Sequence, residues 1–120
     1  MRILVADDSR AVRRGLVNLL SLEKSWQVCG EVEDGASVLP KARELRPELV
    51  LLDMSMPGMN GLEAAAELRR EFPQIKILIL SQHDPAPLSA AAKIAGADAC
   101  LDKARLATEL IATIRKLQAA

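Results

Sequence analysis

Apolar residues fall into five short runs along the chain, and polar residues follow each run. The runs span residues 2–6, 26–32, 48–53, 75–80 and 98–101. Short apolar runs bounded by Gly, Pro or acidic residues are typical of β-strands. The run 48–53 is almost unbroken, which is the pattern of a strand buried on both faces of a parallel sheet.

The segments between the runs show the spacing of amphipathic helices. Ser9 can cap a first helix, whose inward face would carry Val12, Leu16, Leu19 and Leu20. Pro40 would break an interior hydrogen bond, so the helix predicted within 36–46 should begin only at about Ser37 or have a distorted first turn.

Three more helices are predicted in the second half of the chain. One covers about residues 62–72, burying Leu62, Ala65, Leu68 and Phe72, and the last shows Leu106, Leu110, Ile114 and Leu117 on one face. Between them, residues 88–95 form a short helix rich in alanine, which should be the most loosely held because it buries little area. Strand and helix thus alternate five times, which predicts one α/β domain over residues 1–120, a doubly wound (βα)5 parallel sheet with helices on both faces.

Four of the predicted strands end on polar residues suited to chemistry. These residues are Asp7 and Asp8, Asp53, Ser81, and Lys103. Right-handed crossovers make the strands parallel and bring their carboxyl ends to one edge of the sheet, where ligands bind in such folds. Taken alone, Asp53 is equally compatible with a residue that only ends its strand or caps the next turn.

Three carboxylates at one edge would repel one another and raise at least one pKa unless a cation lies between them. Hard oxygen ligands indicate Mg²⁺. A carboxylate can also attack phosphorus and form an aspartyl phosphate, while a metal ion and a lysine neutralise charge on the transferring group. Ser81 could donate a hydrogen bond to a phosphate oxygen. Neither a Ser/His/Asp triad nor a Gly-x-x-x-x-Gly-Lys phosphate loop is present in the sequence.

Composition excludes several other classes of function. The chain has 120 residues, of which 16 are Lys or Arg and 16 are Asp or Glu. This balance argues against binding of nucleic acid by this chain alone, which would need a basic excess on one face. No apolar run approaches the ~20 residues of a membrane span, and no secretory signal precedes the first strand, so a cytoplasmic location is expected. Cys29 and Cys100 lie in apolar patterns and are expected to be buried free thiols.

The sequence resembles the receiver domains of two-component response regulators over essentially its whole length. The matching pieces are Asp7-Asp8, Asp53 followed by Met-Pro-Gly-Met-Asn-Gly at 56–61, Ser81, Gly-Ala-Asp at 96–98, and Lys103. The stretches SMPGMNGLEAA and ILILSQHD, with the Ala after Lys103, are most similar to receivers of the LuxR/NarL type.

The resemblance implies a flavodoxin-like fold with strand order 2-1-3-4-5. It implies phosphorylation of Asp53 by a sensor histidine kinase or phosphotransfer protein. Asp8, Asp53 and the backbone carbonyl of Ser55 would hold Mg²⁺, and Asp7 would act through water. Ser81 and Lys103 would contact the phosphoryl group and report its presence.

The resemblance also implies an output. Phosphorylation would change the conformation of the face formed by the helix at 88–95, the fifth strand and the last helix. This face would control transcription through a helix-turn-helix domain, and the phosphorylated chain could form a homodimer. No such domain lies in these residues, so the chain is expected to be an isolated receiver or a stand-alone protein. No separate substrate is expected, and therefore no enzyme activity.

The sequence departs from the family pattern at three positions. Cys100 stands where many receivers carry Tyr or Phe, so the usual aromatic switch is missing. Gln82 replaces a residue that is often small, and Ala104 replaces a common Pro, so the Lys103–Ala104 peptide bond is expected to be trans. His83 is expected at the rim of the pocket.

Two alternatives remain open at this stage. One is a pseudo-receiver, which would keep the fold as a constitutive interaction module. The other is a small Mg²⁺-dependent phosphatase with Asp53 as nucleophile, for which 120 residues leave no cap or substrate pocket.

Overall fold

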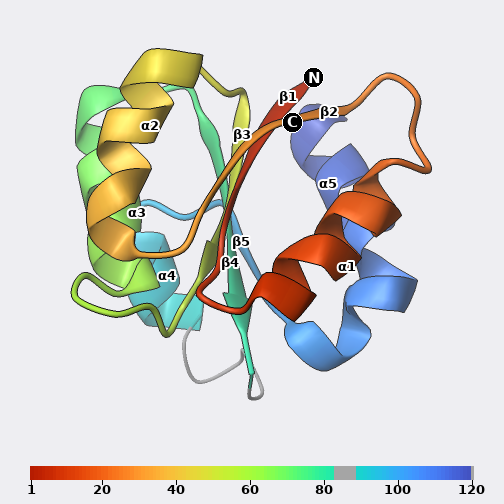
Figure 1. Cartoon of the computed structure of the whole chain (residues 1–120). Helices are drawn as coiled ribbons and strands as arrows, with labels where there is room; N and C mark the ends of the chain where they lie inside the picture. The colour runs from red at the N-terminus through yellow and green to blue at the C-terminus, as the bar shows by residue number, and fades with distance from the viewer. Residues whose placement is uncertain (83–88, 120) are drawn as a thin grey trace.

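The chain forms one five-stranded parallel sheet, as the apolar runs predict. The structure is a computed structural model that describes residues 1–82 and 89–119. The strands lie in the order β2-β1-β3-β4-β5 (Figure 1). Their bounds are β1 (Arg2–Ala6), β2 (Gln27–Val32), β3 (Leu49–Asp53), β4 (Lys76–Ser81) and β5 (Ala99–Asp102). The expected flavodoxin-like order is therefore confirmed.

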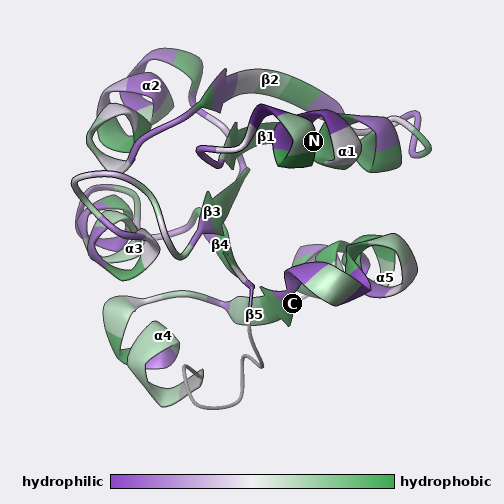
Figure 2. Cartoon of the chain, turned by 60° about the horizontal axis from the view of Figure 1, so that its bottom comes forward, coloured by the Kyte–Doolittle hydropathy of each residue, from purple (hydrophilic) through white to green (hydrophobic). Residues whose placement is uncertain are grey.

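Helices cover both faces of this sheet, giving three layers (Figure 2). On one face lie α1 (Arg10–Leu20) and α5 (Leu106–Ala119), and on the other α2 (Val38–Leu45), α3 (Gly61–Glu71) and α4 (Ser89–Ala95). Each face has its own cluster of buried apolar side chains. Within the described ranges, no helix combines the length and the apolar composition that crossing a membrane would require.

The central strand β3 contributes to both clusters. Leu49 and Leu51 pack on the α1 and α5 side, whereas Val50 and Leu52 pack on the side of α2 and α3. All five residues of β3 are buried. The near-continuous apolar run follows from this two-sided burial, which parallel sheets with helices on both faces require.

Helix boundaries follow local signals in the sequence. The Ser9 side chain accepts a hydrogen bond from Val12 N and caps α1, as predicted. A 3₁₀ turn (Gly35–Ser37) precedes α2, so Pro40 falls in the first turn, where its missing N–H costs no intrahelical bond. In α3, Ala65 and Leu68 are buried as predicted, together with Ala64, whereas Leu62 and the C-cap residue Phe72 are only half-buried and pack against the margin of the core.

The two cysteines are half-buried free thiols, whereas full burial was expected. Their strands are the two edges of the sheet, where the covering layer is incomplete. Cys29 lies at a register shift between β1 and β2 and donates a hydrogen bond from Sγ to Ile3 O at 3.4 Å. Burial raises the pKa of both thiols.

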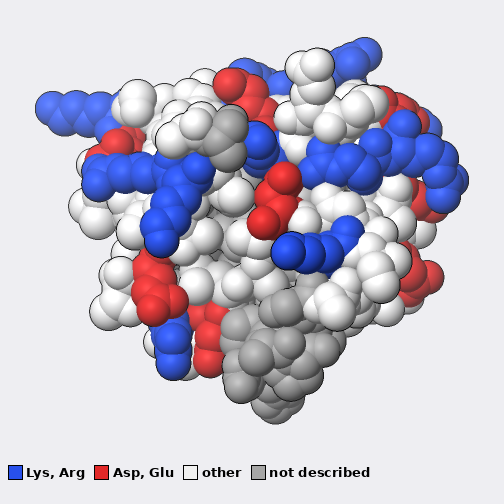
Figure 3. Space-filling model, turned by 180° about the vertical axis from the view of Figure 1, so that it is seen from behind, with Lys and Arg blue, Asp and Glu red and all other residues white. Residues whose placement is uncertain are grey.

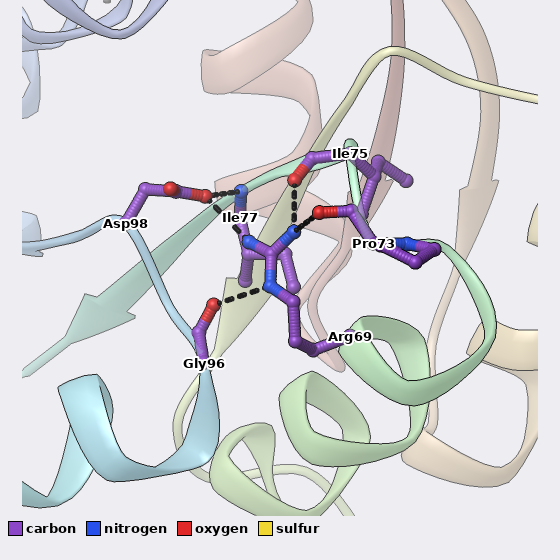
Figure 4. Close-up of polar contacts among 6 residues, drawn as sticks. All are labelled: Arg69, Pro73, Ile75, Ile77, Gly96 and Asp98. Atoms are coloured by element: carbon purple, nitrogen blue, oxygen red, sulfur yellow. Dashed lines mark hydrogen bonds and ion pairs between the residues drawn. The ribbon is translucent and has the colours of Figure 1, made fainter.

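Arg69, near the end of α3, ties together the elements at the amino ends of the strands (Figure 4). Its guanidinium donates to Gly96 O at 2.9 Å, to Pro73 O at 2.8 Å and to Ile75 O at 2.7 Å. It also pairs with Asp98 Oδ2 at 2.8 Å, the oxygen that accepts Ile77 N. Gly96 ends α4 with a φ of +98°, and a Cβ there would lie 2.7 Å from Arg69 Cγ. This network fixes the carboxyl end of α4 to α3 and to the edge of the sheet.

Surface charges of both signs are mixed, and some of them form ion pairs, one of which joins two helices. Figure 3 shows Lys and Arg side chains interspersed with Asp and Glu over the face that it presents. Arg43 of α2 binds both carboxylate oxygens of Glu71 of α3, at 2.6 and 2.7 Å. Exposed pairs of this kind contribute little to stability individually.

Candidate functional site

The polar residues that end the strands meet at the carboxyl edge of the sheet. Asp53 ends the central strand β3, and Asp7 follows β1, its neighbour. Ser81 ends β4 on the other side of β3. Asp7, Asp53 and Ser81 are the buried polar or charged residues of the described chain, at 0%, 2% and 2% exposure. Because burying charge is costly without partners, this group is the leading candidate for a functional site.

Lys103 lies between the two buried carboxylates. Its Nζ is 2.7 Å from Asp7 Oδ2 and 3.0 Å from Asp53 Oδ1, and its side chain is only 11% exposed. The sequence predicted that these residues would meet, and the structure confirms it. The ammonium group is itself the cation that separates Asp7 from Asp53.

The other carboxylate contacts come from the backbone. Asp7 Oδ1 accepts Ser9 N at 2.8 Å, and Asp53 Oδ1 accepts Ser55 N at 3.2 Å. Asp7 Oδ2 is buried and lies 2.7 Å from the Lys103 ammonium, a charge-assisted contact. The charge of this buried oxygen is therefore balanced by Lys103.

Burial and neighbouring charges shift the pKa values of both Asp53 and Lys103. Burial raises the pKa of Asp53, and the neighbouring Asp7 adds to the rise, while Lys103 and the Ser55 N–H oppose it. Burial acts to lower the pKa of Lys103, but hydrogen bonds and attraction to Asp7 and Asp53 outweigh it and the pKa is raised. Lys103 is therefore a fixed positive charge at neutral pH.

Asp8 completes a set that could hold a metal ion. One oxygen each of Asp7, Asp8 and Asp53 lie within 4.8 Å of one another, and Asp8 is exposed. Three carboxylates, one of them open to solvent, fit the preference of Mg²⁺ for a few carboxylate ligands together with water. The oxygen ligands present therefore fit this metal.

The loop after β3 is held tightly against the site. Gly61 begins α3, and a Cβ at this position would lie 2.6 Å from Asp53 O, so only glycine fits there. Asn60 caps the helix through a capping box, accepting Glu63 N at 2.9 Å while Glu63 Oε1 accepts Asn60 N at 3.2 Å. These contacts fix the start of α3 close to the end of β3, which carries Asp53.

Arg13 touches the site without having been singled out from the sequence. Its Nη1 donates to the backbone carbonyl of Asp7 at 2.6 Å, and its Nε pairs with Glu31 at 3.1 Å. Arg10, Arg13 and Arg14 all lie in the first turns of α1, and the local pattern does not tell which of them turns inward. The only signal is that Arg13 lies beside Leu16 and Leu20 on the buried stripe.

The remaining sequence expectations have mixed outcomes. The described residues include no cis peptide bond, so the Lys103–Ala104 bond is trans as expected. Gln82 is exposed. His83 lies outside the described residues. A hollow of about 100 Å³ beside Cys100, lined also by Ala92 and Ala97, lies between α4 and β5. A hollow of about 700 Å³ lies at the opposite end of the sheet, away from the carboxylates.

Comparison with known proteins points to one family. The sequence family described as "Response regulator receiver domain" matches residues 3–115. The response regulator GacA of Pseudomonas viridiflava is 37% identical over 115 residues, covering 96% of this chain and 54% of GacA. The chain thus spans about half the length of the curated relatives it matches.

Solved structures agree with this assignment. The signal receiver domain of the response regulator NarL from Mycobacterium tuberculosis has a TM-score of 0.87 and 35% identity, covering 97% of this chain and 94% of that one. A LuxR-family response regulator from Aurantimonas sp. SI85-9A1 has a TM-score of 0.93 and 30% identity, covering 98% and 84%.

Proposed function

The chain belongs to the family of response regulator receiver domains, with relatives of the LuxR/NarL type, and on this premise we propose that Asp53 is its phosphoryl acceptor. The donor would be a phosphohistidine of a sensor histidine kinase or phosphotransfer protein. The observation that carries the proposal is a buried carboxylate at the end of the central strand, held 3.0 Å from the Lys103 ammonium. The proposal treats residues 1–120 as one receiver domain.

In this reaction an Asp53 carboxylate oxygen forms a bond to phosphorus while the phosphorus–nitrogen bond of the donor histidine breaks. The nucleophile must be ionised, and Lys103 favours the ionised form against the effect of burial. Lys103 would then hold an oxygen of the transferred group, because the negative charge that it balances has moved from Asp53 to the phosphoryl group. Such charge balance is the main contribution of a protein to phosphoryl transfer.

Asp8, Asp53 and the backbone carbonyl of Ser55 would hold Mg²⁺, with Asp7 acting through water. When bound, the ion would neutralise charge on the transferring phosphoryl group. Asp7 lies against both Lys103 and Ser9 N, so it orients the cluster even without a direct contact to the ion.

Ser81 would donate a hydrogen bond to the phosphoryl group and pass its presence to the face formed by α4, β5 and α5. This face would control an output, through homodimer formation or through a helix-turn-helix domain outside these residues. Binding of DNA would belong to that domain, since the charges of this chain are balanced. The location would be cytoplasmic, where histidine kinases draw on ATP.

The test is intact-mass spectrometry after incubation with acetyl phosphate and Mg²⁺. We expect one added phosphoryl group, absent in Asp53→Asn and present in Asp102→Asn, a matched change at the end of β5. An undiminished mass shift in Asp53→Asn would refute the assignment. No shift in the parent chain would favour the pseudo-receiver, and catalytic instead of stoichiometric consumption of acetyl phosphate would favour the phosphatase.

A further inference from the structure

Arg13 joins the metal-binding turn to the neighbouring strand. The turn Asp7–Ser9 connects β1 to α1, and Arg13 lies one turn into that helix. Its guanidinium donates to Asp7 O at 2.6 Å and pairs with Glu31, in β2, at 3.1 Å. The Arg13 side chain is 13% exposed while that of Glu31 is 45% exposed, so the contact to Asp7 lies on the inner side.

We propose that Arg13 is a positioning residue for the metal-binding carboxylates, acting through the backbone of Asp7. The inference rests on the function proposed above and adds a residue to it. Arg13 contacts a carbonyl, not a carboxylate oxygen, so it leaves the ligand atoms of Asp7 and Asp8 available. Its effect is to fix the peptide between these two residues.

Several contacts hold this turn, among them the ion pair of Asp7 with Lys103 and three further hydrogen bonds of Asp7. Asp7 N donates to Val32 O at 3.1 Å, Ser9 N donates to Asp7 Oδ1 at 2.8 Å, and Arg13 holds Asp7 O. Of these, the Arg13 contact is the one made to the carbonyl of the Asp7–Asp8 peptide itself. Asp8 is exposed, so the packing that fixes Asp7 does not fix its side chain. Mg²⁺ demands near-ideal octahedral geometry, and freedom in this peptide would therefore weaken binding.

Removing Arg13 would have opposite effects on Mg²⁺ affinity through its charge and through its contact to Asp7. A positive charge beside three carboxylates repels a divalent cation, so loss of the charge alone would tighten Mg²⁺ binding. Loss of the positioning contact would weaken binding. The sign of the change therefore separates the two roles.

The experiment is calorimetric titration with MgCl₂ of the parent chain, Arg13→Met, Arg13→Lys and Arg14→Met. Arg14 is an exposed neighbour on the same helix and controls for lost charge. We expect the dissociation constant to rise about tenfold in Arg13→Met, the usual scale for residues that orient metal ligands. Arg13→Lys should fall between this variant and the parent, because lysine lacks the planar fork by which Arg13 reaches Asp7 O and Glu31 through two different nitrogens. Arg14→Met should bind like the parent or slightly more tightly.

Two further measurements exclude a general loss of structure. In chelator, hydrogen exchange should be faster in Arg13→Met at the Ser9 amide and unchanged at the amides of β4. With acetyl phosphate, the initial rate of phosphorylation should fall at low Mg²⁺ and return to within about twofold of the parent at saturating Mg²⁺, as expected when binding geometry is lost and the acceptor is intact.

Each outcome decides the matter. Binding by Arg13→Met that equals or exceeds that of Arg14→Met would overturn the inference and leave the proposed function standing. A rate that stays low at saturating Mg²⁺ would also overturn it. If the parent chain binds no Mg²⁺, both the inference and the proposed metal site fail, whereas the mass shift at Asp53 is tested separately.

Discussion

Replacing Asp53 with Asn and Lys103 with Met should change the melting temperature in opposite directions. Burial raises the pKa of Asp53, so at neutral pH the folded state keeps this carboxylate ionised at a cost, and Asn removes that cost. Met at Lys103 does the reverse, because it leaves the buried Asp7 and Asp53 carboxylates without their shared cation. In chelator, Asp53→Asn should therefore melt higher than the parent chain and Lys103→Met lower.

The size of the destabilisation expected in Lys103→Met follows from the burial of the ion pair. The Lys103 side chain is 11% exposed and that of Asp7 is fully buried. Breaking a buried pair by removing one partner costs about 3 kcal/mol. For a domain of 120 residues, with an unfolding entropy of about 2.1 cal/mol/K per residue, this lowers the melting temperature by roughly 12 °C.

Mg²⁺ should stabilise both variants, Asp53→Asn less than the parent and Lys103→Met more. At ten times its dissociation constant the ion stabilises the parent by about 1.4 kcal/mol, or roughly 6 °C. If Asp53→Asn weakens binding tenfold, the same concentration adds only about 0.4 kcal/mol, or roughly 2 °C. Lys103→Met removes a competing cation, and tenfold tighter binding would add about 2.7 kcal/mol, or roughly 11 °C.

The assay is thermal unfolding monitored by circular dichroism at pH 7, in chelator and in Mg²⁺. The matched controls are Asp102→Asn, at a half-exposed position, and Lys93→Met, at an exposed one. The advantage of Asp53→Asn in chelator should shrink as the pH falls through the raised folded pKa of Asp53 and vanish below about 3.9, where Asp53 is protonated in both states of the parent. Equal Mg²⁺ increments in the parent and both site variants would refute the reasoning, because the ion would then bind elsewhere.

Other perturbations test the rest of the structure. Arg69→Met should cost about 2 to 4 kcal/mol in urea unfolding, since it leaves several backbone carbonyls without donors, and a loss below about 0.5 kcal/mol would contradict the network. Asn60→Ala should lower stability by about 1 kcal/mol through loss of its cap, measured in the same way. Cys29 and Cys100 should titrate as two free thiols after unfolding without reductant, because their strands are opposite edges of the sheet, and one disulfide per monomer would contradict the strand order. Because the pKa of Lys103 is raised in the folded state, its contribution to stability is fully present below pH ~10.4 and is lost as the pH rises through the higher folded-state pKa. Alkaline titration should therefore narrow the difference in melting temperature between the parent and Lys103→Met.

The amino-acid sequence carried most of the fold, because the signals involved are local. Apolar runs mark the strands, and the Ser9 cap and Pro40 place the starts of two helices correctly. The pattern of polar residues at strand ends was enough to predict that Asp7, Asp53 and Lys103 meet, because a parallel sheet brings those ends together.

Tertiary packing decided how those residues meet and which others join them. That one ammonium lies within 3.0 Å of two carboxylates depends on β1, β3 and the segment after β5 converging, and no local pattern encodes such a distance. Arg13 and Arg69 look like ordinary surface arginines in the sequence. Each donates to backbone carbonyls, which carry no sequence identity, as well as to a carboxylate, so only the folded chain shows that each fixes a turn. The partial exposure of Cys29 and Cys100 has the same origin, since an edge strand is defined by the neighbours it lacks.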